Sequence, residues 1–333
     1  PLSLGLTGSI PECFSRMPNL QTLAWQLSHL DGGFPTKALQ NLTQLQYLDL
    51  TYCGLEATFP PEFGWNFPDL QHLNLEYNHL TGSIPPQMGQ LPNLELLHLG
   101  SNDLNGTIPE QLLQGLAQYS TLTTLHLGSN ALEGSISSSF CSITSLQALG
   151  LSLNSFNGSI PACLGSLAGL TSLDLGRNNL TGSIPPSLGR LLKTESLTLN
   201  NNELSGYIPL EIGALIKLQK LDLSTNSLEG IVPVDALHNL TALQVLRLFQ
   251  NNLTGKIESL DLSKMPNLQT FGAYGNALEG GLPAGITENK ELVIFDVQGN
   301  KYLTGSLGNT TTAEITGLSK LRVLSVSYNQ LSG

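Results

Sequence analysis

Two histidines stand at equivalent places in two segments that share the same spacing of leucines. His98 and His126 each lie in the sequence Leu-His-Leu-Gly-Ser-Asn, four residues before an asparagine. If these segments form adjacent strands, both side chains point to one side about 5 Å apart. There they could hold a metal ion or form a pH-sensitive patch, with Glu76 as the only candidate for a third ligand. An exposed histidine pair without a metal is the simpler interpretation, so we expect no metal and no cofactor.

The rest of the chain carries no recognisable catalytic motif. It lacks H-E-x-x-H, G-x-S-x-G, a P-loop, a dinucleotide-binding glycine pattern and C-x-x-C. We therefore expect no catalytic residues and no enzyme. Charged residues make up 12% of the 333 residues and the net charge is −11, which argues against nucleic acid, because phosphate binding needs clustered Lys and Arg. No run approaches the roughly 18 apolar residues of a membrane helix, so we expect no direct membrane insertion within this span.

The histidines belong to a leucine pattern that recurs along the whole chain. Residues 170–192 read L-T-S-L-D-L-G-R-N-N-L-T-G-S-I-P-P-S-L-G-R-L-L, and thirteen copies follow one another at spacings of 24 to 29 residues. The alternation in L-D-L predicts a short strand with its leucines inward, and the asparagine after it can bond backbone groups in the turn. Stacked copies bury a continuous core. The sequence therefore predicts an α/β solenoid, a leucine-rich repeat superhelix with a parallel concave β-sheet, of about 13 coils of about 24 residues.

The second half of each copy carries the pattern L-x-G-x-I-P, for example at residues 80–85, 180–185 and 204–209. It resembles the plant-type leucine-rich repeat found in the ectodomains of receptor-like kinases, in receptor-like proteins and in polygalacturonase-inhibiting proteins. The resemblance covers essentially the whole chain. It implies an additional short sheet built by the G-x-I-P segments and a twisted superhelix. It also implies a protein that is secreted or exposed at the extracellular face of the plasma membrane.

The unbroken pattern predicts one array over residues 1–333. Because the chain starts and stops inside a copy, we expect a fragment truncated at both ends. Two insertions lengthen the period. Residues 111–119 predict a fuller helical turn on the side opposite the strands. Residues 309–314 predict a projecting polar loop.

Four cysteines divide into a pair and two single residues. Cys141 and Cys163 occupy slots that lie near each other on adjacent coils, and their spacing resembles a disulfide staple of plant receptor-like proteins. We predict a bridge between them, which requires Cα atoms within about 7 Å. Cys13 occupies the slot of Cys163, but its partner would precede residue 1. Cys53 replaces the asparagine of its copy and is expected to be a buried free thiol.

Seven N-x-S/T sequons favour a glycosylated surface, given the resemblance, although the N-x-L-T-G pattern itself creates some of them. They begin at Asn41, Asn105, Asn157, Asn179, Asn239, Asn252 and Asn309.

Any binding function should lie on the strand face, at the residues six, four, two and one positions before each asparagine. Exposed aromatic residues and Arg are typical of binding hot spots, although scattered surface aromatics are also normal. The candidate ligand-binding residues are Tyr52, Glu76, Tyr77, His98, His126, Arg177, Arg247, Phe249 and Tyr274.

Three functional hypotheses remain. The first is a non-catalytic extracellular recognition domain that binds a peptide, glycan or protein and could engage a co-receptor; inhibition of a secreted cell-wall enzyme is a variant of it. The second is a structural protein of the cell surface or wall. The third is an ice-binding surface made by Thr and Ser of the T-G-S segments. Its regularity is interrupted by Glu133, Tyr207, Glu229, Lys256 and Glu279.

Overall fold

The structure is a computed structural model that describes residues 7–30, 33–60, 63, 67–119, 121–305 and 318–332. These residues divide into two compact units, Pro1–Gly158 and Ser159–Gly333. Thirteen short parallel strands carry the leucine pattern, six in the first unit and seven in the second. The predicted α/β solenoid with about 13 coils is therefore confirmed, while the organisation as one truncated array stays a prediction.

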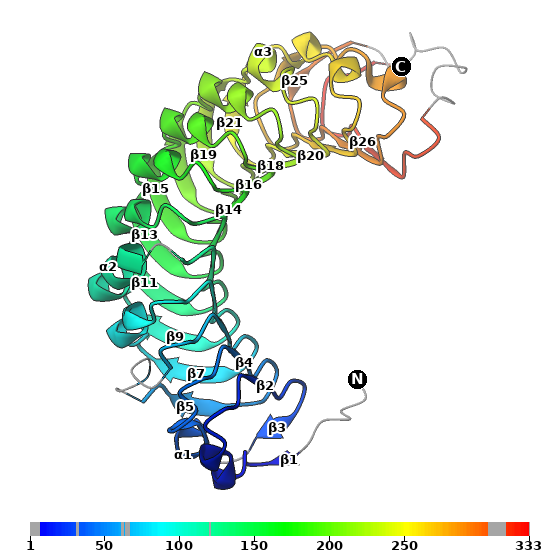
Figure 1. Ribbon diagram of the computed structural model, residues 1–333. Coiled ribbons are helices and arrows are strands. Elements are labelled where there is room, and N and C mark those ends of the chain that lie inside the picture. The colour runs from blue at the N-terminus through cyan, green and yellow to red at the C-terminus, as the bar shows by residue number, and fades with distance from the viewer. Residues whose placement is uncertain are drawn as a thin grey trace. The chain divides into compact units, whose positions relative to one another are not determined.

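In the first unit each coil contributes one strand to a parallel sheet, and consecutive strands pair in register, as Leu73 does with Leu97. In each coil the segment after the main strand contributes to a second, shorter sheet, and short helices lie on the side away from the main sheet (Figure 1). The strands of the main sheet are β2 (Thr22–Ala24), β4 (Tyr47–Asp49), β6 (His72–Asn74), β8 (Leu96–His98), β10 (Thr124–His126) and β12 (Ala148–Gly150). The second sheet contains β5 (Glu56–Thr58), β7 (His79–Gly82), β9 (Asp103–Gly106), β11 (Ala131–Ser135) and β13 (Ser155–Ser159), and β1 (Thr7–Gly8) pairs with β3 (His29–Leu30). The helices are η1 (Glu12–Arg16), α1 (Thr36–Leu39), η2 (Pro86–Gln90), α2 (Glu110–Tyr119) and η3 (Ser138–Ser142).

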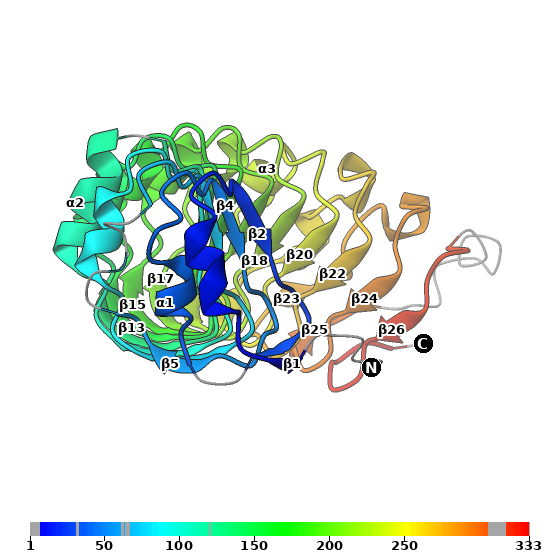
Figure 2. The same cartoon turned by 60° about the horizontal axis from the view of Figure 1, so that its bottom comes forward.

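The second unit repeats this plan, and Figure 2 shows several strands of its main sheet side by side. The main strands are β14 (Ser172–Asp174), β16 (Ser196–Thr198), β18 (Lys220–Asp222), β20 (Val245–Arg247), β22 (Thr270–Gly272), β24 (Ile294–Asp296) and β26 (Val323–Ser325). The shorter strands are β15 (Asn179–Ser183), β17 (Glu203–Gly206), β19 (Ser227–Ile231) and β21 (Asn252–Thr254), with a separate pair, β23 (Glu279–Gly280) and β25 (Tyr302–Leu303). The helices are η4 (Ala162–Ser166), η5 (Pro186–Arg190), η6 (Leu210–Ala214), α3 (Val234–Leu237), η7 (Ile257–Ser259), η8 (Leu262–Lys264) and η9 (Ile286–Glu288).

The leucines of the pattern form the core of each unit. Leu73 and Leu97 of the first unit are completely buried, as are Leu173 and Leu221 of the second. Pro185 precedes η5 with φ of −64°, and Leu188 of that helix is buried. The Ile-Pro pair thus fixes an extended entry into a single helical turn that returns a leucine to the core. The additional sheet implied by the family resemblance is present in both units.

The asparagine of each copy ties neighbouring coils together. Oδ1 of Asn78 accepts hydrogen bonds from the backbone N–H groups of Cys53 and Leu55, at 3.0 and 3.1 Å. Its Nδ2 donates to the carbonyl oxygens of Leu50 and Leu75, at 2.8 and 3.0 Å. Because these backbone groups are buried, each bond avoids an unsatisfied donor or acceptor. Asn102, Asn226, Asn251 and Asn276 also bond the backbone of two coils.

The insertion at residues 111–119 forms helix α2, as predicted, with Leu112, Leu113 and Leu116 buried. The polar loop expected at residues 309–314 lies outside the described residues. Cys141 and Cys163, for which a bridge was expected, are both disulfide-bonded. Cys13 is free and exposed, and Cys53 is free and buried. None of the helices in the described ranges combines the length and apolar character needed to cross a membrane.

Candidate functional site

The main strands end four residues before each asparagine, so the outward residues that follow stand in the turn. This differs from the four strand columns expected from the sequence. Tyr77 and Arg177 occupy the last position before the asparagine and Tyr52 the equivalent position before Cys53, all with φ of 55–56°. Residues other than Gly rarely adopt this left-handed backbone conformation. In later copies Gly275 and Gly299 occupy the same position. The leucine pattern does not predict this conformation. The two glycines are the only signal for it in the sequence.

The strand face of the first unit brings together Glu76, His98 and His126, as the sequence suggested. Nδ1 of His98 lies 4.0 Å from Oε2 of Glu76, and Nδ1 of His126 lies 3.9 Å from Oε1 of the same carboxylate. The two imidazole rings stack with centroids 4.4 Å apart and an interplanar angle of 8°. Among the described residues, these three form the only group whose His, Cys, Asp or Glu donor atoms all lie within 4.8 Å of one another.

Burial dominates the electrostatics of this group, which we call the Glu76 cluster. Burial, followed by repulsion from the neighbouring His126, lowers the pKa of His98 to about 4. Burial also raises the pKa of the Glu76 carboxyl, helped by repulsion from the Asp49 carboxylate. Nε2 of His98 is buried and has no hydrogen-bond partner within the described part of the chain. Both groups are thus held in a poorly solvated environment that disfavours their charged forms.

A stacked tyrosine pair borders the Glu76 cluster, since Tyr77 directly follows Glu76. The rings of Tyr52 and Tyr77 have centroids 4.1 Å apart and are parallel within 5°. Their side chains are 49% and 46% exposed. The left-handed backbone at both residues places them in the turn that follows the strand, and stacking between successive coils holds them together.

The second unit joins a cation to an aromatic pair. Arg247, at the end of β20, donates a hydrogen bond from Nη1 to Oδ2 of Asp222 at 3.3 Å. Asp222 is almost completely buried and also accepts bonds from the backbone and hydroxyl of Ser224. Phe249 and Tyr274 stack with centroids 4.4 Å apart and an interplanar angle of 7°. We call Arg247, Phe249 and Tyr274 the Arg247 surface.

Charged residues nearby, including Arg247, influence the pKa of Tyr274. Burial and the nearby Asp296 carboxylate raise its pKa, although Arg247 opposes the rise. The phenol therefore stays neutral at physiological pH and can serve as a hydrogen-bond donor or acceptor. Arg177 is exposed, but none of the described contacts joins it to this group.

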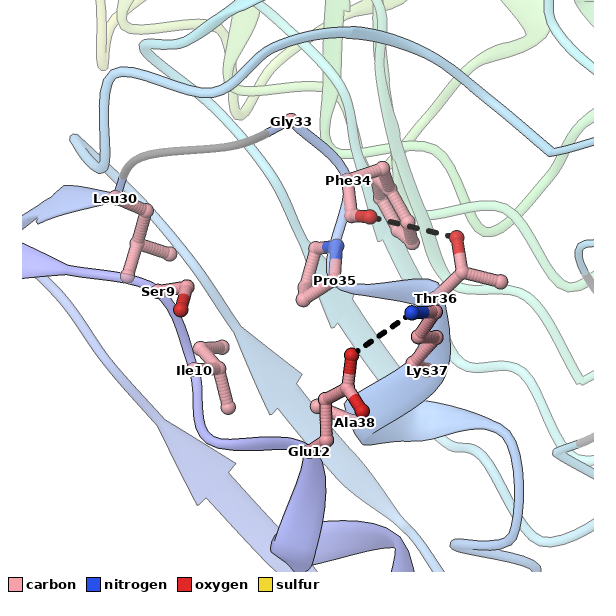
Figure 3. A pocket seen from close by; sticks show the side chains of 10 residues that line it. All are labelled: Ser9, Ile10, Glu12, Leu30, Gly33, Phe34, Pro35, Thr36, Lys37 and Ala38. Atoms are coloured by element: carbon pink, nitrogen blue, oxygen red, sulfur yellow. Dashed lines mark hydrogen bonds and ion pairs between the residues drawn. The ribbon is translucent and has the colours of Figure 1, made fainter.

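A cavity of about 370 Å³ occurs near the beginning of the first unit and was not expected from the sequence. Figure 3 shows Ile10 and Leu30 on one side of it and Pro35 on another, with Glu12 and Lys37 facing each other across 3.0 Å. Both charged side chains are largely exposed. The cavity lies between η1 and α1, away from the predicted binding residues, and it gathers no catalytic constellation.

The predicted glycosylation sites can also be placed. Asn41, Asn105, Asn157, Asn179, Asn239 and Asn252 are all exposed, and Asn309 lies outside the described residues. Exposure satisfies one requirement for glycan attachment. Glycosylation itself stays a prediction.

Comparison with known proteins shows which proteins this chain is similar to. Leucine rich repeat models match residues 120–180 and residues 44–66, 69–91 and 217–240. Over 97 residues the chain is 36% identical to Receptor-like protein 36 of Arabidopsis thaliana, covering 29% of this chain and 13% of that protein. It is similar to the crystal structure of PEPR1–AtPEP1, with 31% identity and a TM-score of 0.85 over 98% of this chain and 44% of the other. This chain carries leucine-rich repeats and is similar to plant receptor-like proteins that are built from them.

Two further structures bear on what such a leucine-rich repeat protein can bind. The plant peptide hormone receptor RGFR1, solved in complex with RGF2, is 28% identical with a TM-score of 0.75, over 99% of this chain and 62% of that chain. A plant ice-binding protein is also 28% identical, with a TM-score of 0.54 over 78% of this chain and 73% of that chain. The leucine-rich repeat protein spans less than two thirds of the length of Receptor-like protein 36, of PEPR1 and of RGFR1.

Proposed function

We propose that this leucine-rich repeat protein is a non-catalytic extracellular recognition domain whose strand face binds a peptide or protein ligand. The observation that carries the proposal is the Arg247 surface, which combines a guanidinium whose side chain is 41% exposed with two stacked aromatic rings, and Arg247 is near enough to Tyr274 to influence its pKa. Arg and aromatic side chains are the residues most often found at binding hot spots. The similarity to RGFR1 in complex with RGF2 and to PEPR1–AtPEP1 supports a peptide as the ligand.

The chemistry of the Arg247 surface suits an extended peptide. The guanidinium has five N–H donors, and its side chain is 41% exposed beyond the bond to Asp222, so donors remain for a carbonyl or carboxylate of a ligand. Phe249 and Tyr274 are already ordered by stacking. Binding therefore loses little side-chain entropy at these rings. A glycan ligand and a co-receptor are further expectations from the family resemblance.

The test is capture of ligands from extracellular fluid of plant tissue by the immobilised chain, with mass spectrometry of the retained peptides, proteins and glycans. The wild type is compared with a double variant, Phe249→Ala with Tyr274→Ala. The matched control is Tyr52→Ala with Tyr77→Ala, which removes an equally stacked pair from the first unit.

We expect a species that the wild type and the control variant retain and the Phe249/Tyr274 variant loses, with all three proteins folded by circular dichroism. Hot-spot truncations commonly weaken binding by about tenfold or more. Equal retention by all three proteins would contradict the assignment of the ligand site to the Arg247 surface.

Ice binding is a second candidate because of the similarity to a plant ice-binding protein. In the shorter sheet of the second unit, Ser205 pairs with Ser183 on one side and Ser227 on the other, which gives a short row of hydroxyls. Tyr207 and Ile231, which are 67% and 72% exposed, interrupt the same edge. Measurable thermal hysteresis in solutions of the chain would favour this candidate, and its absence would leave the recognition domain.

A further inference from the structure

We propose that Glu76, His98 and His126 of the first unit form a binding site for a divalent transition-metal ion of the zinc class. Two imidazole nitrogens and one carboxylate oxygen are the donor set that Zn²⁺ prefers when sulfur is absent. Three protein ligands would leave a further coordination position on the strand face for water or for a donor atom of a bound molecule. The site is independent of the Arg247 surface, which lies in the other unit.

The first argument is the way the three side chains converge from three coils. Glu76 follows β6, His98 ends β8 and His126 ends β10, and these strands pair in register. The carboxylate faces both Nδ1 atoms, at 4.0 and 3.9 Å, which is too far for a hydrogen bond to either. The gap between one acidic and two basic groups is the kind of space that a bridging cation occupies.

The second argument is the space that allows Glu76 to reach across the coils. The residue beside it on the next coil is Gly100, and a Cβ atom there would lie 3.0 Å from Oε1 of Glu76. Any larger residue at position 100 would therefore displace the carboxylate. The glycine leaves room for the acidic side chain to approach both histidines.

The third argument is the poor solvation of the ligands. Nε2 of His98 is buried and has no hydrogen-bond partner within the described part of the chain. The Glu76 side chain is only 21% exposed, and a carboxylate that is withdrawn from water without a hydrogen bond is costly to keep ionised. A divalent cation would relieve that cost by pairing directly with the charge.

Binding requires a defined rearrangement. In a tetrahedral zinc site with bonds of about 2.0–2.1 Å, donor atoms lie roughly 3.3 Å apart, so the observed gaps must close by several tenths of an ångström. Parallel rings also cannot direct their in-plane lone pairs to one point. His126 is the more exposed of the two side chains, at 42% against 16% for His98, so His126 is the ring that binding would rotate.

Two other histidines of the first unit serve as internal comparisons. Nδ1 of His79 lies 3.4 Å from Asp103, and Nε2 of His72 lies 3.9 Å from Glu95. Each faces one carboxylate and lies outside the group of three. A divalent ion that bound only through scattered surface histidines would depend on these residues as much as on the Glu76 cluster.

The test is isothermal titration of the chelator-treated, untagged chain with ZnCl₂, together with the visible absorption of Co²⁺ added in its place. The wild type is compared with Glu76→Gln and with His126→Ala, both at partly exposed positions where folding should be unaffected. His79→Ala is the matched control, and Gly100→Ala tests the displacement of the carboxylate. Circular dichroism verifies that every variant is folded.

We expect one equivalent of Zn²⁺ to bind the wild type and the His79 variant, and Co²⁺ to give a visible spectrum typical of coordination by nitrogen. The affinity should fall by about tenfold or more in Glu76→Gln and His126→Ala, since even loss of outer partners of metal ligands costs 10–100-fold. Absence of saturable binding in the wild type would overturn the proposal. Equal affinity in the wild type, Glu76→Gln and His126→Ala would overturn it as well.

Discussion

The strand faces of the two units use equivalent positions of the repeat but arrange charge in different ways. In the first unit the Glu76 carboxylate stands 3.9–4.0 Å from two histidine nitrogens without a hydrogen bond. In the second unit Arg247 closes a hydrogen bond to Asp222, and Phe249 stacks on Tyr274. The backbone beneath both surfaces is the same paired strand. The difference therefore lies in side chains alone, and it leaves one surface suited to a cation and the other suited to an organic ligand.

If the two surfaces rest on one kind of scaffold, core substitutions should affect both units alike. Leu73→Ala in the first unit and Leu221→Ala in the second each remove a completely buried side chain. Each should lower the free energy of unfolding by about 2–5 kcal/mol, because the cavity cannot collapse fully. Urea denaturation followed by circular dichroism measures this. A cost near zero in one unit only would break the assumption of a common scaffold.

The asparagines provide a second comparison of the units at a smaller expected effect. Asn78→Ala removes the acceptor for Leu55 N–H, and Asn251→Ala removes the acceptor for Leu228 N–H. Both donors would stay buried without a partner, so each change should cost about 1–3 kcal/mol. The measurement is again the midpoint of urea unfolding. An alanine variant as stable as the wild type would contradict the structural role of that asparagine.

Removing the charge of Arg247 and removing the charge of Glu76 should change the stability of the protein in opposite directions. Arg247→Met breaks an ion pair that is partly exposed, so it should destabilise by less than about 1 kcal/mol, and less in high salt. Asp222 keeps its bonds to Ser224.

Glu76→Gln, measured in the presence of a chelator, removes a half-buried charge that has no hydrogen bond, so it should be neutral or slightly stabilising. Thermal unfolding at two salt concentrations tests both. Destabilisation by Glu76→Gln larger than that by Arg247→Met would reverse the comparison.

The smallest expected effect concerns a histidine of the second unit that is hydrogen-bonded, unlike Nε2 of His98. Nε2 of His238 accepts a bond from Asp261 N–H at 2.9 Å, and burial, followed by repulsion from Lys264, lowers the pKa of His238 below its usual value of 6.5. The folded state thus favours the neutral form. Its contribution to stability is fully present above about pH 6.5 and is lost as the pH falls towards the lowered value.

His238→Gln keeps an acceptor oxygen but removes the titration, so its unfolding midpoint should depend less on pH between about 7 and 5 than that of the wild type. Thermal melts at several pH values within this interval provide the measurement. Parallel curves for the two proteins would show that His238 does not contribute.

The sequence predicted the scaffold well because the structure of each coil depends on the residues of a single repeat. The period alone predicts that the leucines of each strand point inward, because the period-2 alternation leaves only one face for them, and Leu73 and Leu221 are indeed buried. The helix at residues 110–119 and the disulfide-bonded Cys141 and Cys163 also followed from the repeat numbering and the family resemblance. The left-handed turns at Tyr52 and Tyr77 did not, because the pattern of leucines carries no information about the backbone where the strand has ended.

The amino-acid sequence by itself thus determined which residues are buried, which asparagine bonds the backbone and which side chains face outward, since each of these depends on the position within one repeat. Only the tertiary structure decided which outward side chains meet. Glu76 reaches two histidines on later coils because Gly100 leaves the space open, and Arg247 finds Asp222 on the preceding coil. Such contacts depend on register, on rotamers and on the size of a neighbour that is distant in sequence. A repeat pattern fixes the first of these, and only packing fixes the other two.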